Sequence, residues 1–258
     1  MYFAAIVMLQ IDSSYQDRLF ETIVNNSIDD SLSDEKKIQK IVELTHRVMG
    51  PPRKGLFLPP ENFRGIKDKY IHSSDIALIG GYACAMHSQV AGMLLTKAGF
   101  KFRFFSMMKE GRYHHVGEVL YNGKYIVVDP LFNQMFVNKN GEYAGADEIH
   151  KNWTFFKKQV GNKLIFKNHK DYSIDFYRKY YDYTPVNNGT GVKTRLMTKI
   201  LGKDRAEKFI TKIKLNKYLY WQIVLSIVYL FVLLLYILNY TLYYIYKKRF
   251  LKDNLLSH

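Results

Sequence analysis

The residues with the clearest chemical potential are a cysteine, a histidine pair and an aspartate that follow one another within residues 80–132. Cys84 is the only cysteine of the 258-residue chain and directly precedes an apolar helical run. His114 and His115 lie inside an alternating segment, and Asp129 ends the next one. This order supplies a nucleophile, a base and a carboxylate that could orient the base. Residues 80–132 are therefore the candidate catalytic core.

Cys84 is expected in the first turn of a helix. Apolar residues recur after it at helical spacing, namely Val90, Ala91, Leu94, Leu95 and Ala98. Gly99 is placed to end this helix in a left-handed cap. The free N–H groups and the dipole at a helix start favour a thiolate, which is the form that attacks a carbonyl. The alternative is a buried cysteine that behaves as a small hydrophobe.

Three β-rich segments, 100–108, 112–121 and 124–129, are expected to form an antiparallel meander packed on this helix. The last two are separated by Asn122-Gly123. This dipeptide between alternating segments predicts a two-residue type I′ hairpin loop, which fixes the pairing register of the two strands.

The register decides which histidine can be oriented by the aspartate. It places Val116 opposite Asp129, and side chains alternate between the two faces of a strand. His114 therefore shares a face with Asp129, within reach of an imidazole–carboxylate hydrogen bond, whereas His115 points to the other face. A lone strand histidine, or an aspartate before a proline, could equally be structural. Their joint occurrence with Cys84 favours the catalytic interpretation.

As a set, these residues resemble the transglutaminase-like superfamily of papain-like cysteine enzymes. The matching positions are Cys84, Ser88, Leu94-Leu95, Gly99, Arg103, His114, Glu118-Val119, Asn122-Gly123-Lys124-Tyr125 and Val128-Asp129-Pro130. The resemblance implies a catalytic triad of Cys84, His114 and Asp129. It also implies an α+β fold with a papain-like or transglutaminase-like core, in which the nucleophile helix packs on an antiparallel sheet. Two positions depart from the pattern: Tyr82 replaces a common glycine, and Val116 a common aromatic residue.

Composition limits the remaining possibilities. The net charge is +15, from 38 Lys and Arg against 23 Asp and Glu, which suggests an anionic partner such as lipid, nucleic acid or an acidic polymer. A single cysteine excludes an intramolecular disulfide framework and a multi-cysteine metal site, and a solitary thiolate is easier to keep reduced in a cytosol. A zinc site built from His87, His114, His115 and Asp129 is conceivable but lacks HExxH-like spacing. No cofactor or metal is expected.

The segments before the core are less informative. Residues 1–9 are apolar but lack the basic flank of a signal peptide, so they suggest a buried strand or the remnant of a longer leader. Residues 13–26 have weak helical character. A helix is expected after the N-cap Ser33, with an apolar stripe of Ile38, Ile41, Val42 and Val48, and it should stop at Gly50-Pro51-Pro52. The loop-rich span 51–79 is either one wall of the substrate groove, as in papain-like folds, or a surface excursion.

Weaker patterns follow the core. A short helix is expected over 146–152, a short strand over 164–167 and a partly helical surface element over 172–183. The turn-rich stretch 187–191 is the best candidate for a domain boundary.

The C-terminal quarter indicates a membrane anchor. Basic and apolar residues interleave over 193–217, which predicts a basic amphipathic helix on an anionic membrane surface. Residues 218–246 then carry no charge, and these 29 residues are enough to cross about 30 Å of hydrocarbon at about 1.5 Å per residue. Two tyrosines and Trp221 flank one end, and four tyrosines flank the other. A buried core helix fits poorly, because the run is apolar on every face.

Four segments result: a transglutaminase-like domain over 1–190, a basic juxtamembrane segment over 191–217, a transmembrane helix over 218–246 and a short basic tail over 247–258. More Lys and Arg precede the span than follow it. The positive-inside rule therefore predicts a single-pass membrane protein with its catalytic domain on the cytoplasmic side.

The leading hypothesis is a membrane-anchored cysteine hydrolase or acyltransferase that acts on a protein, peptide or carboxamide through a thioester. Water as acceptor gives a protease or amidase and an amine gives cross-linking, and the resemblance implies hydrolysis more often. The alternatives are a non-catalytic papain-like binding or scaffold domain at the membrane, and a polyanion-binding adaptor. Nucleic acid is the less favoured partner, because the positive charge is densest beside the span, where anionic lipid accounts for it.

Overall fold

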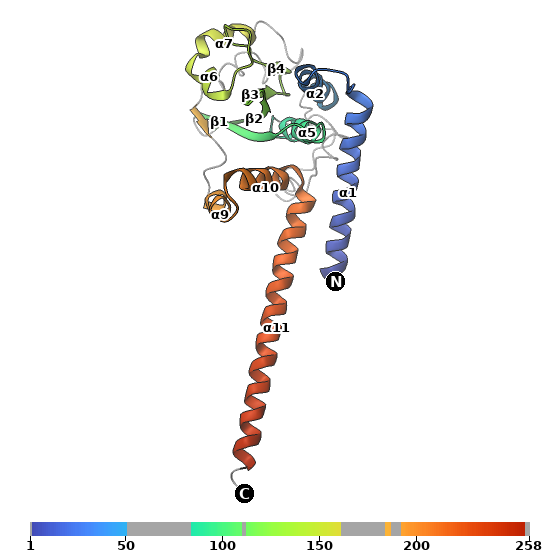
Figure 1. Ribbon diagram of the computed structural model, residues 1–258, viewed down its shortest axis with the longest axis vertical. Helices are drawn as coiled ribbons and strands as arrows, with labels where there is room; N and C mark the ends of the chain where they lie inside the picture. Colours follow the sequence, from blue (N-terminus) through green and yellow to red (C-terminus); the bar gives the residue numbers. More distant parts are fainter. Residues whose placement is uncertain (1, 51–83, 110–111, 161–183, 187–191, 256–258) are drawn as a thin grey trace. The chain divides into compact units, whose positions relative to one another are not determined.

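The computed structural model describes residues 2–50, 84–109, 112–160, 184–186 and 192–255 (Figure 1). The chain divides into two units. The first, called here the sheet unit, is Tyr15–Lys217. The second, called the apolar unit, combines Met1–Ser14 with Tyr218–His258. The segments expected over 51–79, 164–167, 172–183 and 187–191 lie outside the described residues, as does the turn before Cys84.

Helix α2 (Asp34–Met49) starts and ends where the sequence predicts. Ser33 Oγ accepts a hydrogen bond from the N–H of Lys36, and Gly50 caps the other end. Its buried face consists of Ile38, Ile41, Val42, Thr45 and Met49. Val48 is exposed, contrary to expectation, because a helical repeat of 3.6 residues brings Met49 and not its neighbour back to the face of Ile38.

Helix α5 (Cys84–Lys97) carries the cysteine at its first residue. It ends in the expected left-handed cap, with Gly99 at φ +90°. The N–H of Phe100 bonds the carbonyl of Leu95 at 2.9 Å, and the N–H of Gly99 bonds that of Thr96 at 3.2 Å. These two bonds form a Schellman motif. The predicted end of the helix is thereby confirmed, and Cys84 is the first of its described residues.

The sheet has five antiparallel strands in the order β4-β3-β2-β1-β5. Their bounds are β1 (Phe102–Lys109), β2 (Arg112–Tyr121), β3 (Lys124–Asp129), β4 (Gln134–Met135) and β5 (Thr184–Val186). The meander of β1, β2 and β3 was predicted, and the two short edge strands were not. The hairpin loop has φ 49° at Asn122 and φ 78° at Gly123, as a type I′ turn requires. It pairs Tyr121 with Lys124, which confirms the predicted register.

The two faces of the sheet support separate apolar clusters. On one face, strand residues pack with α5, α2 and the C-terminal half of α1 (Tyr2–Ser27). This cluster includes Phe102, Val119, Ile126 and Val128 from the strands, and Leu94, Leu95, Ile41 and Phe20 from the helices. On the other face, strand residues pack with the segment after β3, with α6 (Ala146–Lys151) and with α7 (Trp153–Val160). This cluster includes Phe105, Val116 and Val127 from the strands, and Leu131, Phe136, Ile149 and Phe156 from the segments that cover them. The short helix expected over 146–152 is confirmed as α6.

Close contact between α5 and the sheet depends on two glycines. The ring of Phe102 in β1 lies against Gly92 of α5 and Gly117 of β2. A Cβ at either glycine would overlap this ring. The pair of glycines therefore sets the distance between the helix that begins at Cys84 and the strands that carry the histidines.

The basic segment 193–217 is not one helix, as the sequence suggested, but two: α9 (Val192–Leu201) and α10 (Lys203–Leu215). Gly202, with φ +77°, separates them. Helix α10 packs against α5 and β1, where Ala206 and Leu215 are buried. This part of the apolar stripe is therefore used inside the sheet unit, and it is not a free surface for lipid.

Helix α1 (Tyr2–Ser27) also differs from expectation. A buried strand was one of the two expectations for residues 1–9, and it is wrong because residues from Tyr2 onward are helical. Their apolar side chains are exposed, Phe3 by 79% and Met8 by 60%. Gln10 accepts a hydrogen bond of 2.8 Å from Gln222 within the apolar unit.

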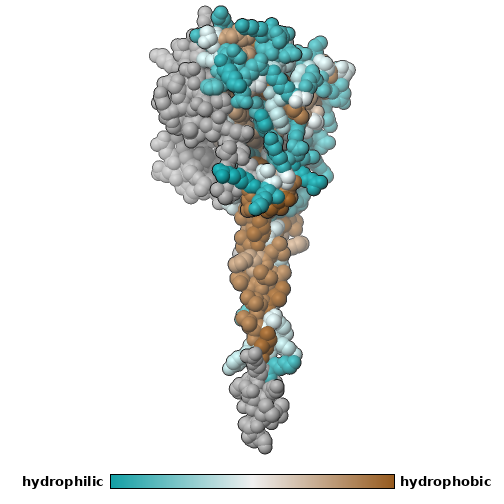
Figure 2. All heavy atoms as spheres, turned by 60° about the vertical axis from the view of Figure 1, so that its left-hand side comes forward, coloured by the Kyte–Doolittle hydropathy of each residue, from teal (hydrophilic) through white to brown (hydrophobic). Residues whose placement is uncertain are grey.

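Helix α11 (Lys217–Leu255) contains the expected span. Among the described helices it alone, over Lys217–Lys248, is long and apolar enough to cross a membrane. Its apolar side chains point outward all round, and Figure 2 shows them as a brown surface. The coarse α+β prediction, helices with a small antiparallel sheet and one apolar C-terminal helix, is confirmed.

Candidate active site

The three predicted site residues come together from three elements. Cys84 opens α5, His114 lies in β2 and Asp129 ends β3. Nε2 of His114 and Oδ2 of Asp129 are 2.7 Å apart, with the two side chains 1% and 0% exposed. The hydrogen bond expected from face parity is therefore confirmed, and it involves His114 and not His115.

The thiol of Cys84 completes the chain of contacts. It is hydrogen-bonded to the imidazole of His114, and Sγ also accepts the backbone N–H of His115 at 3.4 Å. Because Nε2 of His114 faces Asp129, Nδ1 is the nitrogen that remains for the sulfur. Cys84 is half-buried, unlike its two partners, which are buried.

The electrostatics of the site favour an ion pair. Burial raises the pKa of the Cys84 thiol, but the hydrogen bond and charge of His114 outweigh it and lower the pKa below its ordinary value. Burial lowers the pKa of His114, but the Asp129 carboxylate, followed by Cys84, raises it to about 10. Both shifts favour transfer of the thiol proton to the imidazole, which is the state in which the sulfur is a nucleophile.

His115 has a different environment, as the alternation of the strand predicts. Its Nδ1 is hydrogen-bonded to Oγ of Ser106, its partner across the β1–β2 ladder, at 2.6 Å. Burial, and after it the positive charges of His114 and Lys214, lower the pKa of His115. The His115 ring is therefore held neutral, and only its backbone N–H reaches Cys84.

Two residues that the sequence did not indicate support the pair. The ring of Phe132 lies against that of His114, with centroids 5.5 Å apart. From α2, Nδ1 of His46 lies 3.2 Å from the carbonyl of Pro130 and 3.1 Å from that of Leu131. These contacts fix the turn that follows Asp129. Neither residue belongs to a periodic pattern that could have revealed it.

Other motif positions have structural roles. Oγ of Ser88 in α5 donates to the carbonyl of His115 at 2.9 Å, which joins the helix to the histidine strand. Nε of Arg103 donates to Glu118 at 2.7 Å, and its guanidinium lies 3.8 Å from the ring centre of Tyr125. These residues hold the three central strands and the helix in a fixed relation to one another.

A zinc site receives no support from the geometry. Nε2 of His87 lies 3.2 Å from the carbonyl of Gly50. Over the part of the chain that the structure describes, no group of three His, Cys, Asp or Glu side chains could hold a metal ion. The backbone before Cys84, where an oxyanion donor would be sought, lies outside the described residues.

Comparisons of the chain with protein family models, with curated proteins and with solved structures give no match. A function for this site has to be inferred from its own residues and their geometry.

Proposed function

We propose that the chain is a membrane-anchored cysteine enzyme that attacks a peptide or carboxamide carbonyl. The observation that carries the proposal is the continuous hydrogen-bonded series Cys84–His114–Asp129, in which the last two residues are buried and Cys84 is half-buried. A purely structural cysteine needs neither an imidazolium beside it nor a buried carboxylate behind that imidazole. The resemblance to transglutaminase-like enzymes points to the same triad.

The reaction would proceed in two steps. The Cys84 thiolate attacks the carbonyl carbon, and the His114 imidazolium gives its proton to the departing amine as the C–N bond breaks, leaving a thioester. Neutral His114 then takes a proton from the acceptor, which attacks the thioester and releases the thiolate. Asp129 holds the imidazole orientation and stabilises its positive charge in both steps.

The acceptor decides the class of product. Water gives a carboxylic acid, which is protease or amidase chemistry, and a primary amine gives a new amide, which is cross-linking. The family resemblance favours hydrolysis. Because Cys84 lies at one end of α5, the substrate has to present its carbonyl at that helix start.

We further propose that α11 anchors the enzyme in a membrane, with the catalytic domain on the cytoplasmic side. Seven Lys and Arg residues precede the span within about 20 residues, namely Lys199, Lys203, Arg205, Lys208, Lys212, Lys214 and Lys217. Four follow it: Lys247, Lys248, Arg249 and Lys252. A protease added outside intact cells should leave the sheet unit undigested, and digestion from that side would overturn the orientation.

Labelling of Cys84 with an electrophilic peptide-amide probe tests the catalytic proposal. Full-length protein in detergent should react rapidly, Cys84→Ser not at all, and His114→Ala at least about 10²-fold more slowly. His115→Ala is the matched control, since it removes the neighbouring imidazole on the opposite face, and it should retain most of the rate. If His114→Ala labels like the unmodified chain, the site is not a catalytic triad, and the binding-domain alternative is favoured.

A further inference from the structure

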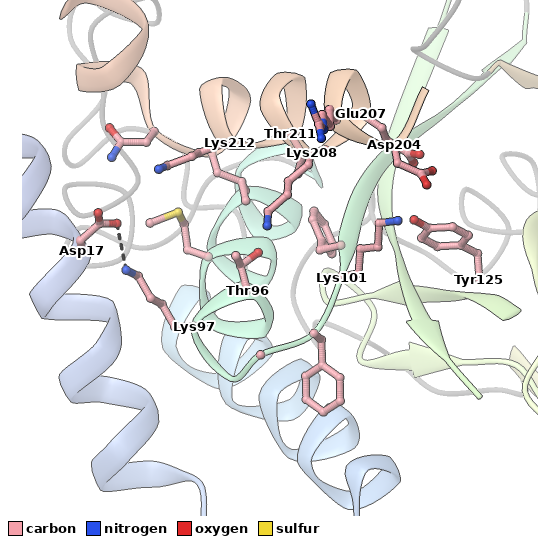
Figure 3. Close-up of a pocket in the computed structure, with 17 residues that line it drawn as sticks. Asp17, Thr96, Lys97, Lys101, Tyr125, Asp204, Glu207, Lys208, Thr211 and Lys212 are labelled. Atoms are coloured by element: carbon pink, nitrogen blue, oxygen red, sulfur yellow. Dashed lines mark ion pairs between the residues drawn. The ribbon is translucent and has the colours of Figure 1, made fainter. Parts of the chain in front are cut away.

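A cavity of about 730 Å³ lies within the sheet unit, between α10, the C-terminal half of α5 and the start of β1 (Figure 3). Thr96 and Lys97 line it, and they lie at the opposite end of α5 from Cys84. The cavity is therefore separate from the candidate active site and has no role in the reaction proposed above.

The cavity combines an apolar floor with a basic rim. Buried Met93, Phe102 and Leu215 contribute to the floor. The rim carries four exposed cations, which are Lys101, Arg205, Lys208 and Lys212. In Figure 3, Lys208 and Lys212 project from α10 toward α5, and Lys101 lies across the cavity beside Tyr125. Such a site suits a ligand with a negative head and an apolar body.

The acidic residues of the lining do not neutralise these cations. Asp17 pairs with Lys97 at 3.1 Å, and Glu207 pairs with Arg103, which is outside the lining, at 3.6 Å. None of the four rim cations forms an ion pair with a residue that the structure describes. Asp204 is the one other carboxylate in the lining. The rim therefore has a surplus of positive charge directed at the cavity.

The connectivity of the chain relates the cavity to the membrane. Two lining residues lie next to the two points where the chain passes into the apolar unit: Asp17 is three residues after Ser14, and Asn216 is two residues before Tyr218. Because consecutive Cα atoms are about 3.8 Å apart, covalent continuity keeps these residues within about 12 Å and about 8 Å of that unit. A site so close to the start of a membrane-spanning helix is within reach of lipid headgroups.

From these observations we propose that the cavity binds the headgroup of an anionic phospholipid from the membrane that holds α11. The inference rests on the membrane anchoring proposed above, but not on catalysis by Cys84. Lys208 and Lys212 contact the phosphate from α10, and Lys101 contacts it from β1's side of the cavity. The apolar floor contacts the glycerol and the first methylene groups of the acyl chains. A free phosphate ion has no apolar part and could not make these contacts.

Native mass spectrometry of the full chain in detergent micelles tests this assignment, with phosphatidylglycerol titrated against phosphatidylcholine. The unmodified chain should retain phosphatidylglycerol selectively. Lys208→Gln with Lys212→Gln should weaken retention at least about tenfold. The matched control, Lys157→Gln with Lys158→Gln, removes two exposed charges from α7 outside the cavity and should change retention less than about twofold.

A second variant tests whether lipid retention requires the cavity itself or only the positive charge around it. Thr211→Trp leaves every charge in place but fills the lining, and it should also reduce retention about tenfold. Three results would each overturn the proposal. The two double variants could lose phosphatidylglycerol equally, Thr211→Trp could retain it like the unmodified chain, or inorganic phosphate could displace it completely. Probe labelling of Cys84 on the same samples reports the catalytic proposal separately, and circular dichroism confirms that each variant is folded.

Discussion

The two units of this chain use the same kinds of apolar residue in opposite ways. In the sheet unit Phe20 and Leu95 are completely buried, whereas in the apolar unit Phe231 is 60% exposed and Phe3 79% exposed. The difference lies in how charge accompanies the apolar residues along the chain. In α2 polar residues alternate with the apolar ones at helical spacing, so that one face is buried and the other is exposed. Helix α5 has no Asp, Glu, Lys or Arg from Cys84 to Thr96, but this run is short enough to be covered by the sheet and the neighbouring helices.

The apolar unit has no such alternation. No charged residue occurs between Tyr2 and Ile11 in α1, or between Tyr218 and Tyr246 in α11. A helix that is apolar on every side is stable as an exposed element only where the surrounding solvent is itself apolar. The comparison therefore indicates that the length of the uncharged run, and not its hydropathy alone, distinguishes a core helix from an exposed apolar one.

The largest difference between the two units is expected when one charged residue is introduced into each of them. Leu95→Asp should prevent folding of the sheet unit, because an unpaired carboxylate would replace a completely buried side chain. Leu234→Asp should leave that unit folded but weaken membrane insertion by about 2.5–3.5 kcal/mol. Limited proteolysis reports the first effect and carbonate extraction of membranes the second. A sheet unit unfolded by Leu234→Asp would contradict the division into units.

A milder pair of changes measures the same contrast in free energy. Leu95→Ala should lower the free energy of unfolding of the sheet unit by about 2–5 kcal/mol, through lost burial and the cavity left behind. Leu234→Ala should change it by less than about 0.5 kcal/mol. Denaturant titration in detergent, followed by the fluorescence of Trp153 in a Trp221→Phe background, gives both values. Similar losses for the two variants would mean that α11 contributes to the core.

The buried charge pair of the sheet unit can be weakened without changing its shape. Asp129→Asn removes the charge that stabilises the His114 imidazolium. The Asp129 charge also raises the pKa of Cys84 directly, but this is a smaller effect than that of His114, so losing the imidazolium should raise the pKa of Cys84 on balance. Each pKa unit reduces the thiolate fraction about tenfold at a pH below that pKa, so alkylation by iodoacetamide at pH 6 should slow by at least about tenfold. Glu118→Gln, on the same strand face as His114, is the control and should have a smaller effect.

The pH profile of the unmodified chain gives a further test. Because the pKa of Cys84 is lowered, alkylation should remain fast below pH 7, and its rate should fall only as the pH drops through that lowered value. Because the pKa of His114 is raised to about 10, the imidazolium should persist through neutral pH, and a second inflection should appear near pH 10. A single titration near the ordinary thiol value would show that no ion pair forms.

The smallest expected effect concerns the N-terminal half of α1. In a Cys84→Ser background, spin labels at Phe3→Cys and Met8→Cys should show the oxygen-rich, water-poor surroundings of lipid in reconstituted vesicles, as a label at Phe231→Cys should. A label at Glu21→Cys, on the part of α1 within the sheet unit, should report water. Water-like signals at positions 3 and 8 would restrict the membrane-embedded region to α11.

The sequence predicted those features that depend on neighbouring residues. Asn122-Gly123 determined the hairpin register and so the choice of His114, Ser33 marked a helix start, and Gly99 marked a helix end. Each of these is a local rule of backbone conformation or capping.

Features that depend on distant residues could not be predicted. Nothing near β5 indicates that it pairs with β1, and the apolar stripe of α10 has the same appearance whether it meets lipid or the sheet. The supporting contacts of Phe132 and His46 likewise require the fold to be known first. At the site itself, the triad residues were predicted, and the residues that hold them in place were not.

The contact of Phe102 with Gly92 and Gly117 has a consequence for how this sequence can vary. The three positions share one small volume, so a larger residue at either glycine requires a smaller one at position 102. Gly117→Ala alone should displace α5, whereas Gly117→Ala combined with Phe102→Leu should recover part of the loss. Among chains that share this fold, the three positions should therefore covary, and a sequence alignment could detect the contact without a structure.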